Sequence, residues 1–186
     1  MQLTGYHDIV ETNLSAAQLD AWLPFAAVLE LLPAALNSQL TNESHLTLLD
    51  FYVLQFLHDA EGQNLRLSNL AASTHSTLPR MSKVASRLEA SGLVSRGSGD
   101  SSDGRALTVS LTADGARALT QATPAHQRTV RSLIIDVLSE QQVLQLRDIA
   151  RALAARLHPD AQVPVDRQRS HACPPVELLG VAPAGN

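Results

Sequence analysis

The sequence has little of what an enzyme, a secreted protein or a membrane protein needs. Its one cysteine, Cys173, lies in a proline-rich stretch, so neither an intramolecular disulfide nor a cysteine metal site can form. The first residues lack a signal-peptide pattern, and no uninterrupted run approaches 18 apolar residues. The chain also lacks a glycine-rich phosphate loop and any Ser/His/Asp signature. We therefore expect a cytoplasmic protein that neither crosses a membrane nor catalyses a reaction.

What the sequence does contain favours helices. Hydrophobic residues make up 45% of the 186 residues and charged residues only 17%, a balance that suits one compact domain. Leucine and alanine dominate, aromatic residues are 3%, and runs of β-branched residues are scarce. We therefore predict a mostly α protein with a single core.

Charge is spread unevenly along the chain, whose formal net charge is −4. Residues 1–65 hold eight acidic residues and neither lysine nor arginine, whereas residues 66–105 hold six basic and three acidic residues. A cationic segment inside an acidic protein is typical of a site for an anionic partner, but chance scatter over solvated faces gives the same count. Charge alone leaves both interpretations open.

Hydrophobic periodicity predicts two helices in the first 60 residues. Apolar residues recur at steps of three and four over residues 16–37, the pattern of a helix that buries a broad stripe. Pro24 and Pro33 each remove a backbone donor, so we expect this helix to be bent or broken there. Thr47 and Asp50 resemble a capping box, which predicts a second helix over residues 48–58.

A short helix, a polar turn and a longer helix are predicted next. Residues 68–73 fit the short helix, and Thr77 can cap the longer one, with Pro79 in its first turn. The longer helix has an apolar face of Met81, Val84, Ala85 and Leu88 and a cationic face of Arg80, Lys83 and Arg87. Gly92 suits the left-handed position at which such a helix ends.

The rest of the chain predicts a hairpin and two more helices. Residues 93–96 and 106–111 read as two strands joined by a long tip rich in glycine, serine and aspartate. Thr112 can cap a long helix with a kink at Pro124, and residues 139–142 form a capping box for a last helix.

Five ordered segments carry a family resemblance. They are Leu46-Thr47 with Phe51, Val53-Leu54 and Leu57; Ser68-Asn69-Leu70-Ala71; Arg87-Leu88-Glu89 with Gly92-Leu93-Val94 and Arg96; Asp103-Gly104-Arg105-Ala106; and Leu111-Thr112 with Gly115. In order and spacing they resemble the MarR family of winged helix-turn-helix transcription regulators, over roughly residues 16–157. The sequence departs from the family at Gly104, often arginine, and in the turn at Thr74, His75 and Ser76.

The resemblance implies a mostly α fold, a winged helix-turn-helix with a two-stranded β-wing and N- and C-terminal dimerisation helices. It divides the chain into an N-terminal helical dimerisation segment (1–45), a winged helix-turn-helix DNA-binding domain (46–112) and C-terminal dimerisation helices (113–158). The remainder is rich in proline, alanine, glycine and glutamine without periodicity, which predicts a flexible proline-rich tail (159–186). Leu133, Ile134, Val137 and Leu138 agree with a homodimer, because a monomer would expose them. Packing on their own domain is the alternative.

The resemblance also implies a double-stranded DNA partner, with the cationic helix in the major groove. Arg80 and Lys83 are the first candidates, because both side chains donate to guanine or phosphate. Arg105 is the candidate for the minor groove, braced by Asp103, although the two residues could form a mere surface ion pair. Two roles are open for Arg87: its aliphatic stem covers the core, or its guanidinium reaches a phosphate. The candidate DNA-binding residues are Arg66, Ser68, Ser76, Thr77, Arg80, Ser82, Lys83, Arg87, Asp103 and Arg105.

We therefore expect a nucleoid-associated repressor that reads an inverted-repeat operator as a homodimer. Family members often bind small aromatic effectors between the DNA-binding lobe and the dimer helices, and Trp22, Phe25 and His45 are candidates to line such a crevice. Ordinary core packing is the alternative for these residues. No cofactor or metal is expected, since no histidines pair at helical spacing. The alternative function is a winged-helix protein-interaction module without specific DNA binding, which salt-sensitive binding to duplex DNA would distinguish.

Overall fold

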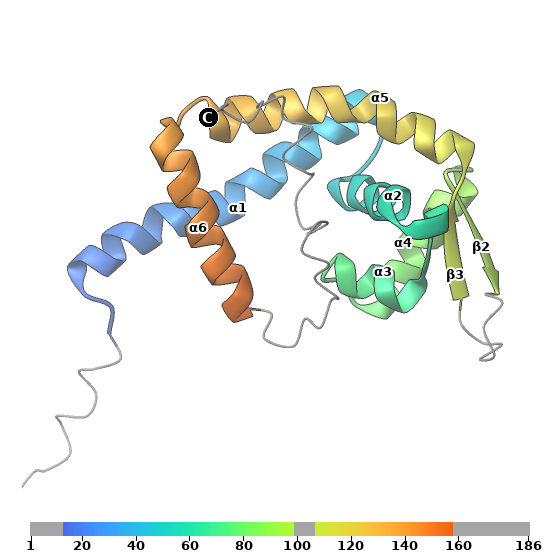
Figure 1. Cartoon of the computed structure of the whole chain (residues 1–186), viewed down its shortest axis with the longest axis horizontal. Coiled ribbons are helices and arrows are strands. Elements are labelled where there is room, and N and C mark those ends of the chain that lie inside the picture. The colour runs from blue at the N-terminus through green and yellow to red at the C-terminus, as the bar shows by residue number, and fades with distance from the viewer. Residues whose placement is uncertain (1–12, 99–106, 158–186) are drawn as a thin grey trace, which may run out of the picture.

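The computed structural model of the protein describes residues 13–98 and 107–157. A winged-helix lobe, made of the elements from α2 to β3, lies beside the long helix α5, and α1 and α6 extend beyond it (Figure 1). The elements are α1 (Ala16–Ser44), α2 (Leu48–Asp59), η2 (Glu61–Gln63), β1 (Asn64–Arg66), α3 (Leu67–Ser73), α4 (Leu78–Ala90), β2 (Val94–Ser98), β3 (Leu107–Leu111), α5 (Ala113–Val130), η3 (Arg131–Ile135) and α6 (Glu140–Leu157).

Helix α1 is one continuous helix of 29 residues. Ser15 caps it through a capping box, in which its hydroxyl accepts from the backbone of Gln18 and the Gln18 side chain accepts from the backbone of Ser15. The helix is not broken at Pro24 or Pro33, because both prolines lie inside it, and it continues to Ser44, beyond the predicted end at residue 37. Both prolines are exposed, so water can bond the carbonyls that they leave free.

The lobe has a continuous apolar core. Helix α2 begins at the predicted capping box, in which Thr47 and Asp50 exchange hydrogen bonds of 2.9 and 3.1 Å. Its apolar side chains meet those of α3, α4, the sheet and α5, as the 3.6-residue period predicts. The core comprises Leu40, Leu46, Phe51, Val53, Leu54, Leu57, Leu67, Leu70, Ala71, Met81, Val84, Ala85, Leu88, Val94, Val109, Leu119 and Ala122.

The sheet has three antiparallel strands in the order β1-β3-β2. Val109 at its centre is fully buried and pairs with Leu65 of β1 on one side and Arg96 of β2 on the other. The two-stranded wing of β2 and β3 was predicted, whereas the third strand, β1, was not. Strand β1 has three residues, too few to show the alternation that marks a strand in a sequence.

Two glycines shape the junction of α4, the wing and α5. Gly92 has a φ of 73°, as predicted for the residue that ends a helix, and the next residue, Leu93, donates to the carbonyl of Leu88 at 2.9 Å. Thr112 caps α5 by accepting from Gly115 and donates to the carbonyl of Gly92 at 2.7 Å. A Cβ at Gly115 would overlap the carbonyl oxygen of Leu93, so only glycine fits there.

The C-terminal helices follow the predicted order. Helix α5 includes Pro124, and a departure from α geometry that was not predicted comes at the π-helical η3. The predicted capping box of the last helix is confirmed, with Ser139 and Gln142 exchanging hydrogen bonds of 2.9 and 3.3 Å. The predicted tail, residues 159–186, lies outside the described residues.

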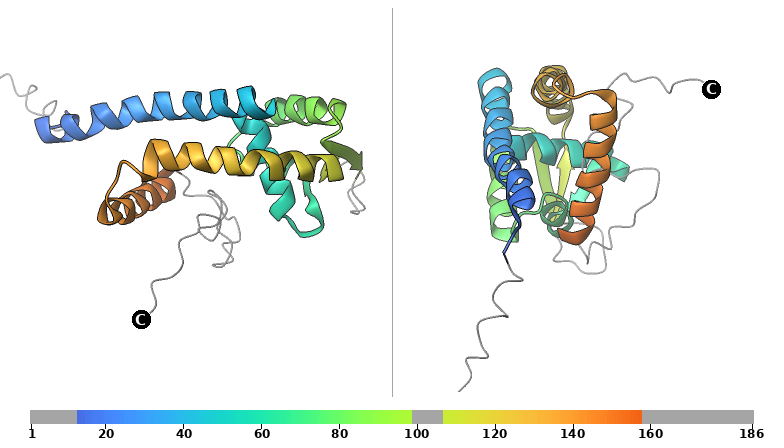
Figure 2. Two further views of the ribbon diagram at one scale, coloured as in Figure 1. Left: turned by 90° about the horizontal axis from the view of Figure 1, so that it is seen from above. Right: turned by 90° about the vertical axis from the view of Figure 1, so that its left-hand side faces the viewer.

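Helices α1 and α6 leave the rest of the chain on different sides and stand apart from one another (Figure 2). No residue of α6 is buried, and the buried residues of α1 are Leu36 and Leu40. We call residues 16–35 and 140–157 the arms. Large apolar side chains lie exposed along both arms: Leu19, Trp22, Leu23, Phe25, Val28, Leu29, Leu31, Leu144, Leu146, Ile149, Leu153 and Leu157.

Candidate nucleic-acid interface

Helix α4 has one buried and one cationic face. Met81, Val84, Ala85 and Leu88 are all buried, as predicted from their spacing. The candidates Arg80 and Lys83 are exposed on the opposite side. The core therefore fixes the rotation of α4 about its axis and leaves its cationic face to solvent. That arrangement allows two donors to enter a groove without any loss of apolar packing.

The start of α4 is suited to bind an anion. Thr77 caps the helix by accepting from the backbone of Arg80 at 3.4 Å, and Pro79 occupies the first turn. The structure describes every residue of this first turn, and none of them is acidic. No carboxylate therefore neutralises the positive end of the helix dipole. Leu78, the first residue of α4, is 51% exposed, an unusual position for a leucine in the lobe. Sequence reasoning did not single out Leu78, because its spacing from Met81 and Ala85 is that of the buried stripe and only the structure shows that it is exposed.

The turn between α3 and α4 is tight and left-handed. His75 has a φ of 51°, in the left-handed region that glycine adopts most easily. This explains why glycine is frequent at this position in the family that the sequence resembles. The backbone of Ser76 donates to the carbonyl of Ala71 at 2.8 Å. The side-chain oxygen of Ser76 is buried without a hydrogen-bond partner among the described residues. Of the candidate DNA-binding residues, Ser76 therefore turns its hydroxyl inward.

Three further candidates lie around this helix pair. Arg66 is the last residue of β1 and precedes α3, and Ser68 lies in the first turn of α3; both are exposed. Ser82 is partly buried on α4, and its carbonyl accepts from the hydroxyl of Ser86 at 2.9 Å. Arg66 and Ser68 are thus free of the core, whereas the side chain of Ser82 is less accessible.

Arg87 faces a protein carboxylate. Its two terminal nitrogens donate to the two carboxylate oxygens of Asp50, at 2.9 and 2.6 Å. Asp50 is 1% exposed, so the pair ties α4 to the buried start of α2. The sequence left Arg87 open between the core and DNA, and this structure places its guanidinium on Asp50. The spacing of 37 residues between the partners explains why no sequence pattern revealed the pair.

The wing is attached to α4 by a second ion pair. Arg96 of β2 donates to Glu89 from its side chain at 2.6 Å and from its backbone at 3.2 Å, and to the hydroxyl of Ser86 at 2.8 Å. The hydrogen bond from the Arg96 side chain lowers the pKa of Glu89. The candidates Asp103 and Arg105, and with them Gly104, lie outside the described residues.

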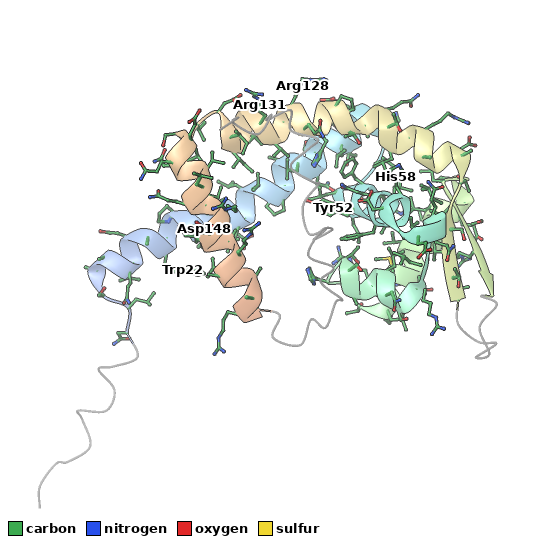
Figure 3. The ribbon with its side chains drawn as sticks, in the orientation of Figure 1. Trp22, Tyr52, His58, Arg128, Arg131 and Asp148 are labelled. Atoms are coloured by element: carbon green, nitrogen blue, oxygen red, sulfur yellow. The ribbon has the colours of Figure 1, made fainter. Side chains whose placement is uncertain are left out.

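The candidate effector residues are not brought together within one chain. Trp22 and Phe25 are neighbours on the first arm, with ring centroids 6.3 Å apart, and both are exposed. Figure 3 labels Trp22 on this arm. His45 ends α1, 20 residues after Phe25, which corresponds to about 30 Å along a helix. Within residues 13–98 and 107–157, no group of three or more His, Cys, Asp or Glu side chains could hold a metal ion.

Comparison with solved structures finds close likeness, although neither a protein-family model nor a curated protein matches the sequence. A MarR family transcriptional regulator from Streptomyces coelicolor, solved in complex with DNA, is 29% identical, covers 80% of this chain and 92% of its own, and superposes with a TM-score of 0.76. AbsC, a MarR family transcriptional regulator from the same organism, is 30% identical over 79% of this chain and 98% of its own, with a TM-score of 0.74. The transcriptional regulator BldR from Sulfolobus solfataricus, 24% identical with a TM-score of 0.62, shares the fold over 74% of this chain and 95% of its own.

Proposed function

The chain belongs to the MarR family of transcriptional regulators, a non-enzymatic family, and we propose that it is a repressor that binds an inverted-repeat operator as a homodimer. The observation that carries this proposal is the division of α4 into a buried apolar face and an exposed cationic face at Arg80 and Lys83. A dimer bound over a promoter would exclude RNA polymerase. Repression therefore needs no further activity of the protein.

Helix α4 reads the major groove in this proposal. Arg80 and Lys83 donate to guanine edges or phosphates, while the hydroxyl hydrogen of Thr77 and the backbone N–H of Leu78 bind a phosphate at the start of the helix. Leu78, exposed at the same end, suits contact with a thymine methyl group. We assign phosphate contacts to Arg66 and Ser68 as well, because both are exposed at the start of α3. Arg105 in the minor groove, with Asp103 as its brace, remains a prediction from the family resemblance.

The arms form the dimer interface. Nearly every position of the first arm is apolar, so this helix has no polar face to turn toward water. The second arm has exposed apolar residues at positions 146, 149, 153 and 157, the spacing of a single stripe. Monomeric proteins rarely leave such continuous apolar surface in water. A second copy, with its own two arms, would bury both sets at once around a two-fold axis.

A membrane is the competing environment for the first arm. Helix α1 is the one helix in the described part of the chain that is long and apolar enough to span a bilayer. However, Leu36 and Leu40 are buried, and Leu40 belongs to the core of the lobe, so the last part of α1 is anchored in the protein. The second arm, which is not apolar all round, would remain uncovered in a bilayer. Dimerisation covers both arms, which is why we prefer it.

A small aromatic effector is a secondary part of the proposal. The exposed pair of Trp22 and Phe25 offers two aromatic faces on an arm that the dimer would enclose. Because Trp22 is the one tryptophan of the sequence, its fluorescence reports directly on this place. Titration with 4-hydroxybenzoate should quench Trp22 emission saturably in the wild type. A linear response equal to that of free tryptophan would remove this part of the proposal.

The test of the proposed function is a titration of the full chain into fluorescent duplex DNA from the region upstream of its own gene, at several salt concentrations. We expect specific binding that weakens steeply with salt. Arg80→Ala should weaken it by about five- to 150-fold, and Lys83→Ala should also reduce the salt slope by about one if Lys83 contacts phosphate. Arg117→Ala is the matched control, because Arg117 is exposed on a different helix, α5, where it pairs with Asp114.

Two outcomes would count against this function. Binding that is weak, indifferent to sequence and unchanged by Arg80→Ala would mean that α4 does not read DNA. The winged-helix protein-interaction module would then be the better description. An equal loss of affinity in Arg117→Ala would mean that the substitutions act through net charge and not through a contact of α4.

A further inference from the structure

The start of α2 is a polar joint between α1, whose first part forms one of the arms, and the helix that reads DNA. From α1, the side-chain oxygen of Asn37 accepts from the backbone of Leu48 at 3.0 Å. From α4, Arg87 donates to both carboxylate oxygens of Asp50. The first turn of α2 therefore bonds to α1 on one side and to α4 on the other.

Asp50 contributes more hydrogen bonds to this joint than Asn37 does. Its carboxylate accepts three hydrogen bonds, one from the backbone of Thr47 at 2.9 Å and two from Arg87. Its side chain is 2% exposed, whereas that of Arg87 is 51% exposed. A buried carboxylate needs its partners, and a paired guanidinium fixes direction as well as distance. The pair therefore constrains the second half of α4, beyond what apolar contacts at Met81 and Leu88 can do.

Apolar packing alone leaves α4 some freedom. Side chains such as Met81 can slide along a neighbouring surface at small cost, because dispersion contacts have no strong directional preference. A bidentate ion pair has one favourable geometry. Removal of the pair should thus leave the lobe folded but allow small shifts of α4 relative to α2.

We propose that Asp50 is a positioning residue for DNA recognition, which acts through Arg87 to hold α4 at the angle that an operator half-site requires. This proposal rests on the proposed function, because it needs an operator to be read. It assigns to Arg87 a role inside the protein in place of a phosphate contact. It also makes the start of α2 the place where movement of α1 would reach α4.

A phosphate contact by Arg87 is the competing role, and salt dependence separates the two. Each phosphate that a protein neutralises adds about 0.9 to the slope of log affinity against log salt. A positioning residue changes affinity without changing that slope. Asp50 itself, buried and anionic, cannot contact DNA, so its replacement tests the positioning role directly.

The experiment compares full-length Asp50→Asn, Arg87→Lys, Arg87→Met and the double variant Asp50→Asn/Arg87→Met on the duplex that the wild type binds. Asp50→Asn keeps an oxygen for the Thr47 backbone, and Arg87→Lys keeps a positive charge beside Asp50, so both should fold. Arg87→Met leaves a buried carboxylate unpaired, and the double variant relieves that charge. Arg117→Met is the matched control, since Arg117 pairs with Asp114 on its own helix.

We expect Asp50→Asn and Arg87→Lys each to weaken operator binding by roughly 2- to 30-fold with the salt slope unchanged. The double variant should lose about as much as Asp50→Asn alone, because both remove the same link. Wild-type affinity in Asp50→Asn would overturn the proposal, as would a slope reduced by about 0.9 in Arg87→Met but kept in Arg87→Lys. If the wild type itself showed no salt-sensitive binding, the proposed function would fail instead.

Discussion

The lobe and the arms are built from similar residues and have opposite environments. Leucines of the lobe such as Leu54 and Leu57 are fully buried, whereas leucines of the arms such as Leu23 and Leu31 are more than half exposed. Both regions are helical and both follow ordinary capping rules. The difference teaches that, within the described part of the chain, packing covers the apolar surface of the lobe and leaves that of the arms exposed. The proposed dimer would cover this second surface with another copy of the same chain.

A charge introduced into the apolar surface of an arm should have the largest effect, which we expect on the assembly of the dimer. Ile149→Glu places a charge in the exposed stripe of α6, so a two-fold dimer loses the burial of two isoleucines, about 3–6 kcal/mol in all. Analytical ultracentrifugation should find a monomer at concentrations at which the wild type is a dimer. The lobe should keep its far-UV circular dichroism.

The matched control for the arm is Arg151→Glu. It introduces the same glutamate two positions further along α6, on the opposite side of the helix from the stripe. This variant should remain dimeric. If both variants or neither dissociated, the stripe at Ile149 would not be the interface.

Removal of a buried side chain from the core of the lobe should have the next largest effect, which we expect on the free energy of unfolding. Leu54→Ala removes a fully buried side chain and should lower the free energy of unfolding by about 2–5 kcal/mol. Leu31→Ala is the same substitution at a side chain that is 69% exposed. Urea denaturation of the monomer at low protein concentration should leave Leu31→Ala within about 0.5 kcal/mol of the wild type. Equal losses in the two variants would contradict the comparison.

The junction between lobe and α5 should be sensitive to a single methyl group. Gly115→Ala would push a Cβ into the carbonyl of Leu93 and should cost about 1–3 kcal/mol in thermal or urea unfolding. Gly97→Ala on β2 is the control, because a Cβ there meets no atom within 4 Å. A tolerated Gly115→Ala would mean that the start of α5 can shift away from the wing.

The smallest effect concerns acid stability. His126 of α5 is 4% exposed, its ring lies 4.5 Å from that of Phe51, and burial lowers the pKa of the imidazole. The unfolded chain then binds a proton more readily than the folded one, so stability is full above the unfolded pKa and falls as pH drops through the folded pKa. His126→Leu should flatten the loss of thermal stability between pH 7 and pH 5. His58→Gln, a change at an exposed histidine of α2, should leave that loss in place.

Much of the fold was predictable because it depends on neighbours in the sequence. Capping boxes at Thr47 and Ser139, the left-handed Gly92 and the two faces of α4 each rest on residues within a few positions of each other. The cationic face at Arg80 and Lys83 follows from the same spacing. The short strand β1 escaped prediction, because three residues carry no periodic signal.

By itself, then, the sequence determined which segments are helical, which face of α4 is cationic and, through an ordered set of motifs, which family the chain resembles. Only the tertiary structure decided that α1 continues through two prolines, that Arg87 bonds to Asp50 and that the arms stand uncovered. The physical reason is the range of the interactions. Local hydrogen bonds and periodicity act within a few residues, whereas ion pairs and burial join residues that only the folded chain brings together.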